Sequence, residues 1–292
     1  MARLKMKHIN PPEIDDIVEL QSLANNRRLG SYPKLLSEYL IFREQYNKFT
    51  VNGGNPWVIN TVITDVDFGN ALINHYVDSP EGRLLFIKDF RRTVSPTVCP
   101  MCGGFGNGTL DHYLPKADYP EFSFFSKNLV PACNCNSLRG TAVKGVRASE
   151  RAIHPYFDTF LNQRLYTTLF EGSFEVPRIS INVLDPNHPN IDIIQFHLDE
   201  VINNEATNGW FDKYWSDLIL RPNEILDLVL PPTPQLITID ELITATTRYR
   251  NSKDKEHNTQ NNWLSIFYTG LINDQARLGG LLEIINSSRQ PR

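Results

Sequence analysis

The sequence lacks any long hydrophobic run: none of its apolar stretches approaches the roughly 18 residues needed to cross a bilayer. The N-terminal residues are basic, but no apolar segment follows them as it would in a secretion signal. A strong net charge is also absent, because the formal charge at pH 7 is only -4. This balance excludes a protein that coats nucleic acid through bulk charge. We therefore expect a soluble, unexported, cytoplasmic protein with no membrane association.

Cysteine is scarce, and its placement is informative. The 292-residue chain has four cysteines, and all of them fall within the 37 residues from Cys99 to Cys135. A disulfide framework would scatter its cysteines more widely, whereas clustering favours a metal site in a reducing cytoplasm. A hydrophobic content of 41% is ordinary for a globular chain and permits a substantial core.

Helical patterns dominate both flanks of the cysteine segment. Apolar residues recur at helical spacing in Glu13–Arg27, and helical patterns return from Phe68 to Val94. After the centre, β-rich runs at 174–183 and 191–201 predict a hairpin around a Pro- and Asn-rich turn, and helices follow. We therefore predict a mainly α protein with a small α+β centre. Its predicted regions are a helical N-terminal region (1–95), a central module (96–157) and a C-terminal region (158–292).

The central module is rich in loops and carries local positive charge. Between Arg83 and Arg151 the sequence has ten basic and five acidic residues. Such segregation also arises by chance in many domains, so it is only a candidate footprint for a polyanion. The same segment is dense in Gly, Pro, Asn and Cys and has no long periodic stretch. Small irregular units of this kind usually need a covalent or metal staple.

The cysteine spacing predicts such a staple. Cys99 and Cys102 form a C-x-x-C knuckle, and Cys133 and Cys135 supply a C-x-C pair about thirty residues later. Two thiolate pairs at this separation fit a tetrahedral structural zinc site that would draw the two halves of the segment together. The alternatives are buried free thiols or a degenerate site that has lost its metal. The C-x-C bite is tighter than C-x-x-C, yet it is geometrically compatible with zinc.

Polar residues of a second kind lie between and after the cysteine pairs. Asp111 and His112 stand in the run LDHYLPK, Asn128 precedes the apolar pair LV, and Asn136 directly follows the last cysteine. An Asp-His pair alone is a weak signal, more often an exposed turn than a catalytic site. The order and spacing of the whole set, however, are specific.

These residues resemble the HNH, or ββα-metal, nuclease superfamily, in particular its zinc-bearing branch with four cysteines. The resemblance covers residues 99–140 and implies a strand ending at Asp111 and His112, a second strand beginning near Asn128, and a short helix from about Asn134 to Gly140. It implies a metal-dependent endonuclease that hydrolyses the phosphodiester bonds of nucleic acid, for which we expect DNA.

The resemblance also implies roles for the site residues. His112 would be the general base that deprotonates water. Asp111 and Asn136 would be oxygen ligands to one catalytic Mg²⁺ or Mn²⁺ ion, and the substrate phosphate would complete the coordination. Asn128 would fix the loop and help to orient His112. Because the C-x-C pair is one residue short, Asn136 is the position most exposed to a register error, and His154 is an alternative or additional ligand.

Other residues near the motif have two readings. His154 precedes Pro-Tyr-Phe-Asp and can equally be a packing residue at a domain junction. The remaining histidines show no partner pattern, so structural or surface roles are expected for them. Four cations border the motif and would contact backbone phosphates, although each can equally be a solvated surface charge. They are Lys116, Arg139, Lys144 and Arg147.

Three functional hypotheses remain open at this stage. The first is the HNH endonuclease, whose size and helical flanks resemble effectors of bacterial antiphage or restriction cassettes; an ATPase partner or a homo-oligomer would fit that setting. The second is a non-catalytic zinc module that binds nucleic acid or a partner protein. The third, an unrelated enzyme with catalytic zinc, is disfavoured because four thiolates leave zinc no open position for water.

Overall fold

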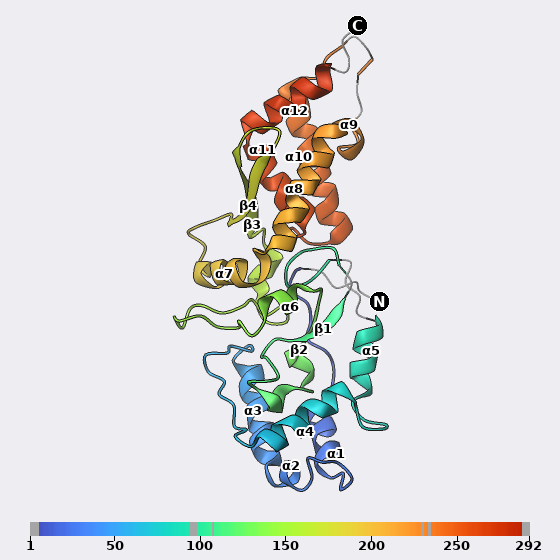
Figure 1. Ribbon diagram of the computed structural model, residues 1–292, viewed down its shortest axis with the longest axis vertical. Helices are drawn as coiled ribbons and strands as arrows, with labels where there is room; N and C mark the ends of the chain where they lie inside the picture. The colour runs from blue at the N-terminus through green and yellow to red at the C-terminus, as the bar shows by residue number, and fades with distance from the viewer. Residues whose placement is uncertain (1–5, 94–97, 107, 229–230, 233–234, 288–292) are drawn as a thin grey trace.

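The computed structural model describes residues 6–93, 98–106, 108–228, 231–232 and 235–287. The molecule is elongated, with helices α1 to α4 at one end, helices α8 to α12 at the other, and strands β1 and β2 with helix α6 between them (Figure 1). The elements up to the centre are α1 (Asp16–Ala24), α2 (Lys34–Ser37), α3 (Tyr39–Val51), α4 (Val66–Val77), α5 (Leu85–Thr93), β1 (Thr109–His112), η1 (Pro120–Phe122), η2 (Ser126–Asn128), β2 (Leu129–Ala132) and α6 (Cys135–Arg139). Those after it are η3 (Thr159–Asn162), β3 (Tyr166–Gly172), β4 (Pro177–Val183), α7 (Ile191–His197), η4 (Leu198–Ile202), α8 (Glu205–Leu220), α9 (Pro222–Ile225), α10 (Ile239–His257), α11 (Trp263–Asn273) and α12 (Gln275–Ser287).

Side-chain caps explain where several helices begin. The carboxylate of Asp15 accepts hydrogen bonds from two backbone N–H groups at the start of α1, and Asp65 does the same for α4. Thr238 and Glu241 form a reciprocal capping box at the start of α10. These side chains satisfy N–H groups that have no partner within the helix. The predicted helices of both flanks are therefore present, and the first begins three residues later than expected.

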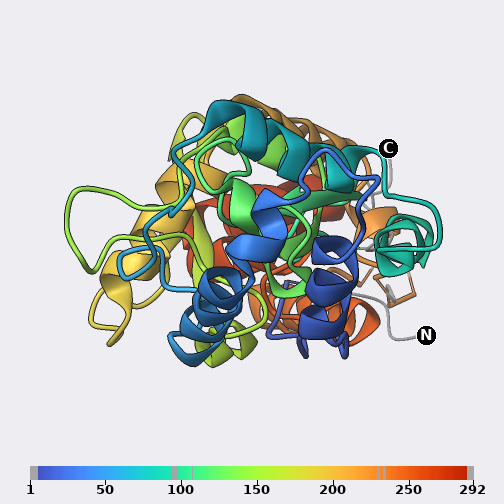
Figure 2. The same ribbon diagram turned by 90° about the horizontal axis from the view of Figure 1, so that it is seen from below.

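Aromatic residues pack the N-terminal helices onto the segment that connects β1 and β2. The ring of Tyr46 in α3 stacks on Phe125 with centroids 4.2 Å apart, and Phe49 packs against Phe122 at 5.4 Å. All four side chains are buried. Seen from below, helices α1, α3 and α4 surround this connecting segment (Figure 2). The segment itself contains only single 3₁₀ turns, so its shape depends on this packing.

The centre is an antiparallel ribbon followed by a short helix. The register pairs Thr109 with Ala132 and His112 with Leu129, so β1 and β2 match over four residues. Helix α6 starts at Cys135 and ends at Arg139, before Gly140 with φ +60°. The strand, strand and helix thus occur at the residues where the sequence predicted them.

The C-terminal hairpin differs from its prediction. Strand β4 pairs antiparallel with β3, which precedes it, and residues 173–176 form the turn. The expected second strand at 191–201 is wrong, because these residues form α7 and η4. Ile191, Ile194 and Leu198 recur at helical spacing, and this periodicity outweighs their β-branched character. Residues 56–65, which precede α4, form neither strand nor helix.

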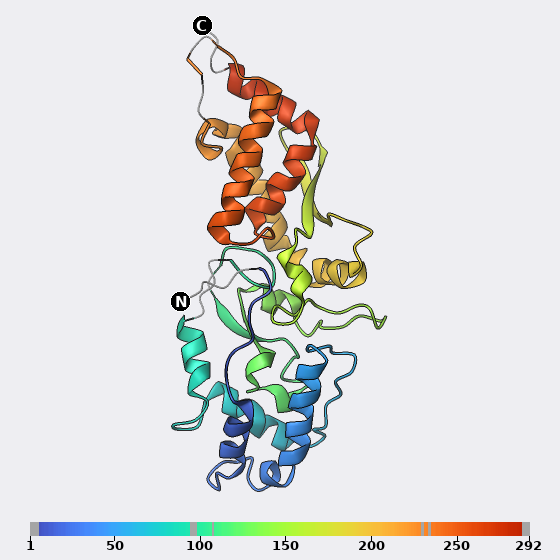
Figure 3. The ribbon, with the colours of Figure 1, turned by 180° about the vertical axis from the view of Figure 1, so that it is seen from behind.

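The hairpin packs on the C-terminal helices (Figure 3). Thr168 of β3 donates its hydroxyl to the carbonyl of Phe267 in α11 at 3.0 Å. Gly270 makes this approach possible, because a Cβ atom there would lie 2.1 Å from the carbonyl oxygen of Thr168. The helices and the hairpin therefore form one packed unit at this end of the molecule.

Over the residues that the structure describes, the chain is about half helical with two small antiparallel strand pairs, which confirms a mainly α class with a small α+β component. Its buried apolar side chains form one connected cluster that includes residues from all three predicted regions. The boundaries near residues 95 and 157 stay predictions. Within the described residues, no helix combines the length and apolar character needed to cross a membrane.

Candidate metal centre and adjoining catalytic site

The four cysteines come together as the sequence predicted. Their Sγ atoms all lie within 4.8 Å of one another, with Cys99 and Cys135 at 3.6 Å and Cys102 and Cys133 at 3.4 Å. Disulfide sulfurs would be about 2.05 Å apart. Sulfurs around a tetrahedral zinc ion with bonds of about 2.3 Å lie about 3.8 Å from each other. The cluster can therefore hold a zinc ion, and every ligand it offers is a thiol.

Backbone amides point at these sulfurs. The N–H of Gly104 donates to Sγ of Cys102 at 3.4 Å, and the N–H of Cys133 donates to Sγ of Cys99 at 3.2 Å. Such bonds stabilise the negative charge that thiolate ligands carry. Hydrogen bonds from the other three cysteine thiols, that of Cys102 foremost, lower the pKa of the Cys133 thiol far below its usual range, whereas the pKa values of the Cys102 and Cys135 thiols are raised. Of these three thiols, that of Cys133 therefore loses its proton most readily.

Residues far along the chain clamp the knuckle, and sequence reasoning missed them. The indole N–H of Trp263 donates to the carbonyl of Cys102 at 2.8 Å, and Nε2 of His197 donates to the carbonyl of Met101 at 2.6 Å. At Gly104 a Cβ atom would lie 2.5 Å from the Trp263 ring. His197 was expected to be structural or surface, and it is buried and structural. The GG pair after the second cysteine was the only sequence signal of this close approach.

His112 ends β1 as predicted, with a defined proton arrangement. Its Nε2 lies 2.9 Å from the carbonyl oxygen of Ser123, which can only accept, so Nε2 carries the proton. Burial lowers the pKa of His112 to about 4, which keeps the ring neutral at pH 7. Among the described residues, no hydrogen bond engages Nδ1. That nitrogen therefore remains as an acceptor for a water molecule.

Asp111 is held by the short helix that follows the cysteines. Its Oδ2 atom lies 3.0 Å from a terminal nitrogen of Arg139, and its Oδ1 atom accepts the backbone N–H of His112 at 2.8 Å. The Arg139 side chain is 1% exposed and also donates to the carbonyls of His112 and Tyr113. Arg139 therefore holds the end of β1 in place instead of presenting a surface charge to phosphate as the sequence suggested.

Asn128 fixes the loop between the strands. Its side-chain oxygen accepts the N–H of Leu114 at 2.7 Å, and its amide nitrogen donates to the carbonyls of Leu114 and Phe122, both at 3.1 Å. The side chain is fully buried. Phe122 precedes Ser123, whose carbonyl binds His112, so Asn128 supports the hydrogen-bond partner of the proposed base. The structure therefore shows Asn128 fixing this loop, and its link to catalysis stays a prediction.

Two buried carboxylates, which sequence reasoning did not identify, fasten the same loop to the N-terminal region. Asp16 accepts the backbone N–H and the hydroxyl of Ser126, both at 2.8 Å, and pairs with Lys127 at 2.9 Å. Glu121 accepts the N–H of Val62 and the hydroxyl of Thr61. Burial raises the pKa of both carboxyl groups. No local sequence pattern pairs residues this far apart.

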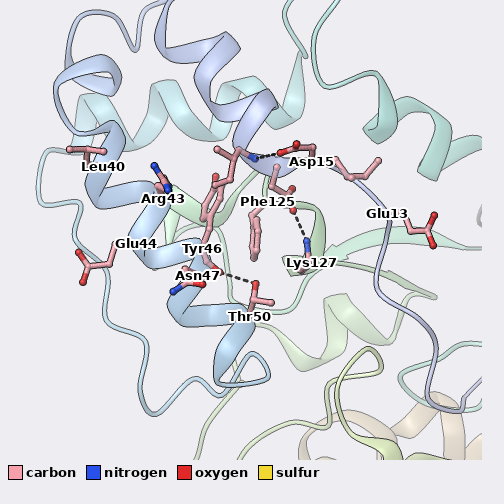
Figure 4. Close-up of a pocket in the computed structure, with 13 residues that line it drawn as sticks. Glu13, Asp15, Leu40, Arg43, Glu44, Tyr46, Asn47, Thr50, Phe125 and Lys127 are labelled. Atoms are coloured by element: carbon pink, nitrogen blue, oxygen red, sulfur yellow. Dashed lines mark hydrogen bonds and ion pairs between the residues drawn. The ribbon is translucent and has the colours of Figure 1, made fainter.

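An open pocket of about 910 Å³ lies between α1 and α3, beside the Asp16–Lys127 pair (Figure 4). Tyr46 and Phe125 form part of its wall, and Glu13, Arg43 and Glu44 contribute charges of both signs. Neither the cysteines nor Asp111 and His112 line it. The pocket therefore adjoins the loop that supports His112 but is separate from the candidate catalytic residues.

The remaining site residues occupy varied places. Lys116 is half-buried beside the ring of Tyr76, and Lys144 lies over Trp57 and donates to the carbonyl of Pro56. The 64% exposed side chain of Arg147 pairs with Glu150 and Asp192. Of Lys116, Lys144 and Arg147, only Lys116 contacts a residue that also contacts His112. That residue is Tyr76.

The two other predicted ligands are His154 and Asn136. His154 is fully buried among aromatic rings, the nearest being Tyr113 at 4.2 Å, and its Nδ1 accepts the N–H of Tyr156. These contacts are those of a packing residue, and among the described residues His154 belongs to no group of three or more metal-type ligands. The backbone of Asn136 lies in α6, but its side chain is outside the described residues.

Comparisons with known proteins add one relative. No family model matches the chain, and no solved structure matches it. Among curated proteins, the chain is similar to Protein ea31 of Escherichia phage lambda, with 30% identity over 166 residues. The aligned region covers 53% of this chain and 56% of the phage protein, so each is matched over about half its length. That name states no activity, so function must be argued from this chain's own residues.

Proposed function

We propose that the chain is a metal-dependent endonuclease of the HNH type, with the ribbon β1–β2 and helix α6 as its catalytic module and a four-thiolate zinc ion as its staple. The observation that carries the proposal is the arrangement of His112. Its Nε2 proton is committed to the Ser123 carbonyl, the ring is neutral, and Nδ1 is left to accept a proton. A carboxylate, Asp111, lies next to it on the same strand.

The residues divide the work. His112 accepts the proton of the attacking water at Nδ1, while its Nε2–H bond to Ser123 keeps the ring oriented. Asn128 holds the loop that presents Ser123. Arg139 keeps Asp111 at the end of β1, and a carboxylate, with about four acceptor sites, can bind a cation as well as an arginine. A pKa of about 4 makes His112 a weaker base than an imidazole near its usual value of 6.5.

The catalytic cation would be Mg²⁺ or Mn²⁺, held by Asp111 and Asn136. When bound, it supplies charge neutralisation at the phosphate and a more acidic water. Among the described residues, Asp111 is the one carboxylate that this proposal assigns to the cation. Mg²⁺ suits such a site, since it typically keeps several waters and uses one or two carboxylates together with substrate phosphates. We expect modest affinity for the free ion.

A nicking assay tests the proposal. Supercoiled plasmid DNA is incubated with the zinc-loaded chain and Mg²⁺ or Mn²⁺, and nicked and linear forms are quantified. His112→Ala should slow cleavage by about 10² to 10⁴-fold, as expected for loss of a general base. His188→Ala, at a half-buried histidine outside the motif, is the matched control and should cleave at the native rate. Equal cleavage by His112→Ala and the native chain would contradict the assigned mechanism.

One observation favours the alternative of a non-catalytic zinc module. Arg139 already neutralises Asp111, which is what a purely structural strand end would need. Under this alternative the native chain would cleave neither DNA nor RNA with either cation, yet would still bind nucleic acid or a partner protein. DNA as substrate, a role in antiphage defence and an ATPase partner or second copy of the chain belong to the nuclease proposal. Co-purification from the native host tests the partner.

A further inference from the structure

A cluster of positive charge next to His112 involves a residue that the motif does not contain. The ring of Tyr76, at the end of α4, lies 4.3 Å from the ring of His112. The guanidinium carbon of Arg91 in α5 is 4.5 Å from the centroid of the same tyrosine ring, and the amine of Lys116 is 5.1 Å from it. Helix α5 contributes Arg91, and the end of β1 with the loop after it contributes His112 and Lys116. These two cations and the proposed base therefore surround one aromatic side chain from α4.

Tyr76 is a fixed platform for this cluster. It is 7% exposed, and its hydroxyl donates to the carbonyl of Leu110 in β1 at 2.8 Å. Arg91 is tied to the end of α4 by one bond, from its guanidinium to the carbonyl of Tyr76 at 3.1 Å. Cation–π contacts add to this hold. The cations are thus positioned by the fold and are not free to sample the whole surface.

The two cations have no acidic partner within the described part of the chain. No carboxylate forms an ion pair with Arg91 or Lys116 there, whereas Arg147, Arg151 and Arg164 each pair with an aspartate or glutamate. Asp111, the acidic residue next to His112, is engaged by Arg139. Arg91 uses one of the five N–H donors of a guanidinium, so most of its donors are available to a ligand. Positive charge beside the proposed base is consequently uncompensated.

We infer that Arg91 and Lys116 form a phosphodiester-binding subsite beside His112, with Tyr76 as its platform. The guanidinium offers two parallel N–H donors to non-bridging oxygens, and the lysine adds a point charge. The choice of a polynucleotide as ligand rests on the proposed nuclease function. The subsite holds the backbone of the strand next to the cleaved bond and does not read sequence, because phosphate contacts carry no base information.

Salt-dependent binding tests this inference without requiring cleavage. Anisotropy of a short labelled DNA duplex of mixed sequence is measured at several salt concentrations, with no Mg²⁺ or Mn²⁺ added. Arg91→Gln and Lys116→Gln should each weaken binding by about tenfold and lower the slope of log K against log salt by about one. Arg91→Lys should retain most of the slope because it keeps the charge.

Matched controls separate this subsite from general charge loss. Arg178→Gln and Lys213→Gln remove the same charges from exposed positions in the C-terminal region and should leave the slope unchanged; neither residue forms an ion pair with any described residue. Thermal melting confirms that each variant is folded. Binding by Arg91→Gln and Lys116→Gln that matches the native chain would overturn the inference, as would a native chain that does not bind the duplex. Native binding with the expected slopes but no cleavage under Mg²⁺ or Mn²⁺ would refute only the nuclease proposal.

Discussion

Asp111 and His112 lie between the two cysteine pairs in the sequence. The cysteine cluster and the Asp111–His112 centre are nevertheless held in place in different ways. All four thiols come from one 37-residue segment, and backbone amides of the same segment donate to their sulfurs. The second centre instead depends on remote residues: Tyr76 packs on His112, and the carboxylates of Asp16 and Glu121 fasten the loop behind it. A metal can organise the first centre locally, whereas the second needs the N-terminal helices.

Helix α6 connects the two centres. It begins at Cys135, a member of the thiol cluster, and ends at Arg139, the partner of Asp111. With only five residues, this helix has no independent stability and depends on its attachments. The position of Asp111 should therefore depend on a zinc ion bound by the four thiols. Removal of the zinc ligands should therefore disturb both centres.

Loss of the metal should have the largest effect, because it removes both centres together. Cys99→Ser removes one of the four thiolate ligands, so the chain should no longer bind zinc stoichiometrically. Structural zinc sites contribute about 10 kcal/mol or more to the folding of small modules, so the loss of zinc should also destabilise this segment. Cleavage should fall by more than about 100-fold as α6 and Asp111 lose their positions. Zinc content by mass spectrometry and plasmid nicking check this, with Met101→Leu, between the knuckle cysteines, as the matched control. Full cleavage by a zinc-free chain would break the proposed coupling.

The difference between the centres also explains how far sequence reasoning reached. Spacing predicted the cysteine cluster, and the resemblance to the HNH superfamily implied the two strands and α6; all of these features are local. It failed for the second strand of the C-terminal hairpin, where β-branched residues form a helix, and it did not foresee that Arg139 is buried. It also missed the clamps made by Trp263 and His197, since contacts between residues about 100 or more positions apart leave no periodic signal.

A smaller effect, confined to the second centre, is expected at Arg139. Arg139→Met should destabilise the chain by about 3 kcal/mol, because removing one partner of a largely buried ion pair leaves Asp111 uncompensated. Zinc should stay bound, in contrast to Cys99→Ser. The free energy of unfolding is measured in urea, with zinc content alongside. Arg147→Met, at a 64% exposed side chain, should change stability by less than about 0.5 kcal/mol. Asp111→Asn combined with Arg139→Met should recover part of the loss; a strictly additive double variant would argue against the ion pair.

The smallest effect is the contribution of one N-terminal histidine to acid sensitivity. His75 is buried, its Nε2 lies 2.8 Å from the hydroxyl of Ser31, and its ring packs near Phe124 in the loop behind His112. Burial lowers its pKa to about 4, against about 6.5 when unfolded. As pH falls below about 6.5 the unfolded chain binds a proton that the folded chain refuses, so stability decreases towards pH 4 by up to about 1.4 kcal/mol per pH unit. His75→Gln should therefore lose less stability between pH 7 and pH 5 than the native chain does, measured by urea unfolding with zinc present.

Ser31→Ala removes the hydroxyl but keeps the imidazole, and should retain the native pH dependence. If His75→Gln were as acid-sensitive as the native chain, the N-terminal histidine would have no part in that sensitivity, and protonation of the thiolates or of the other buried histidines would have to account for it.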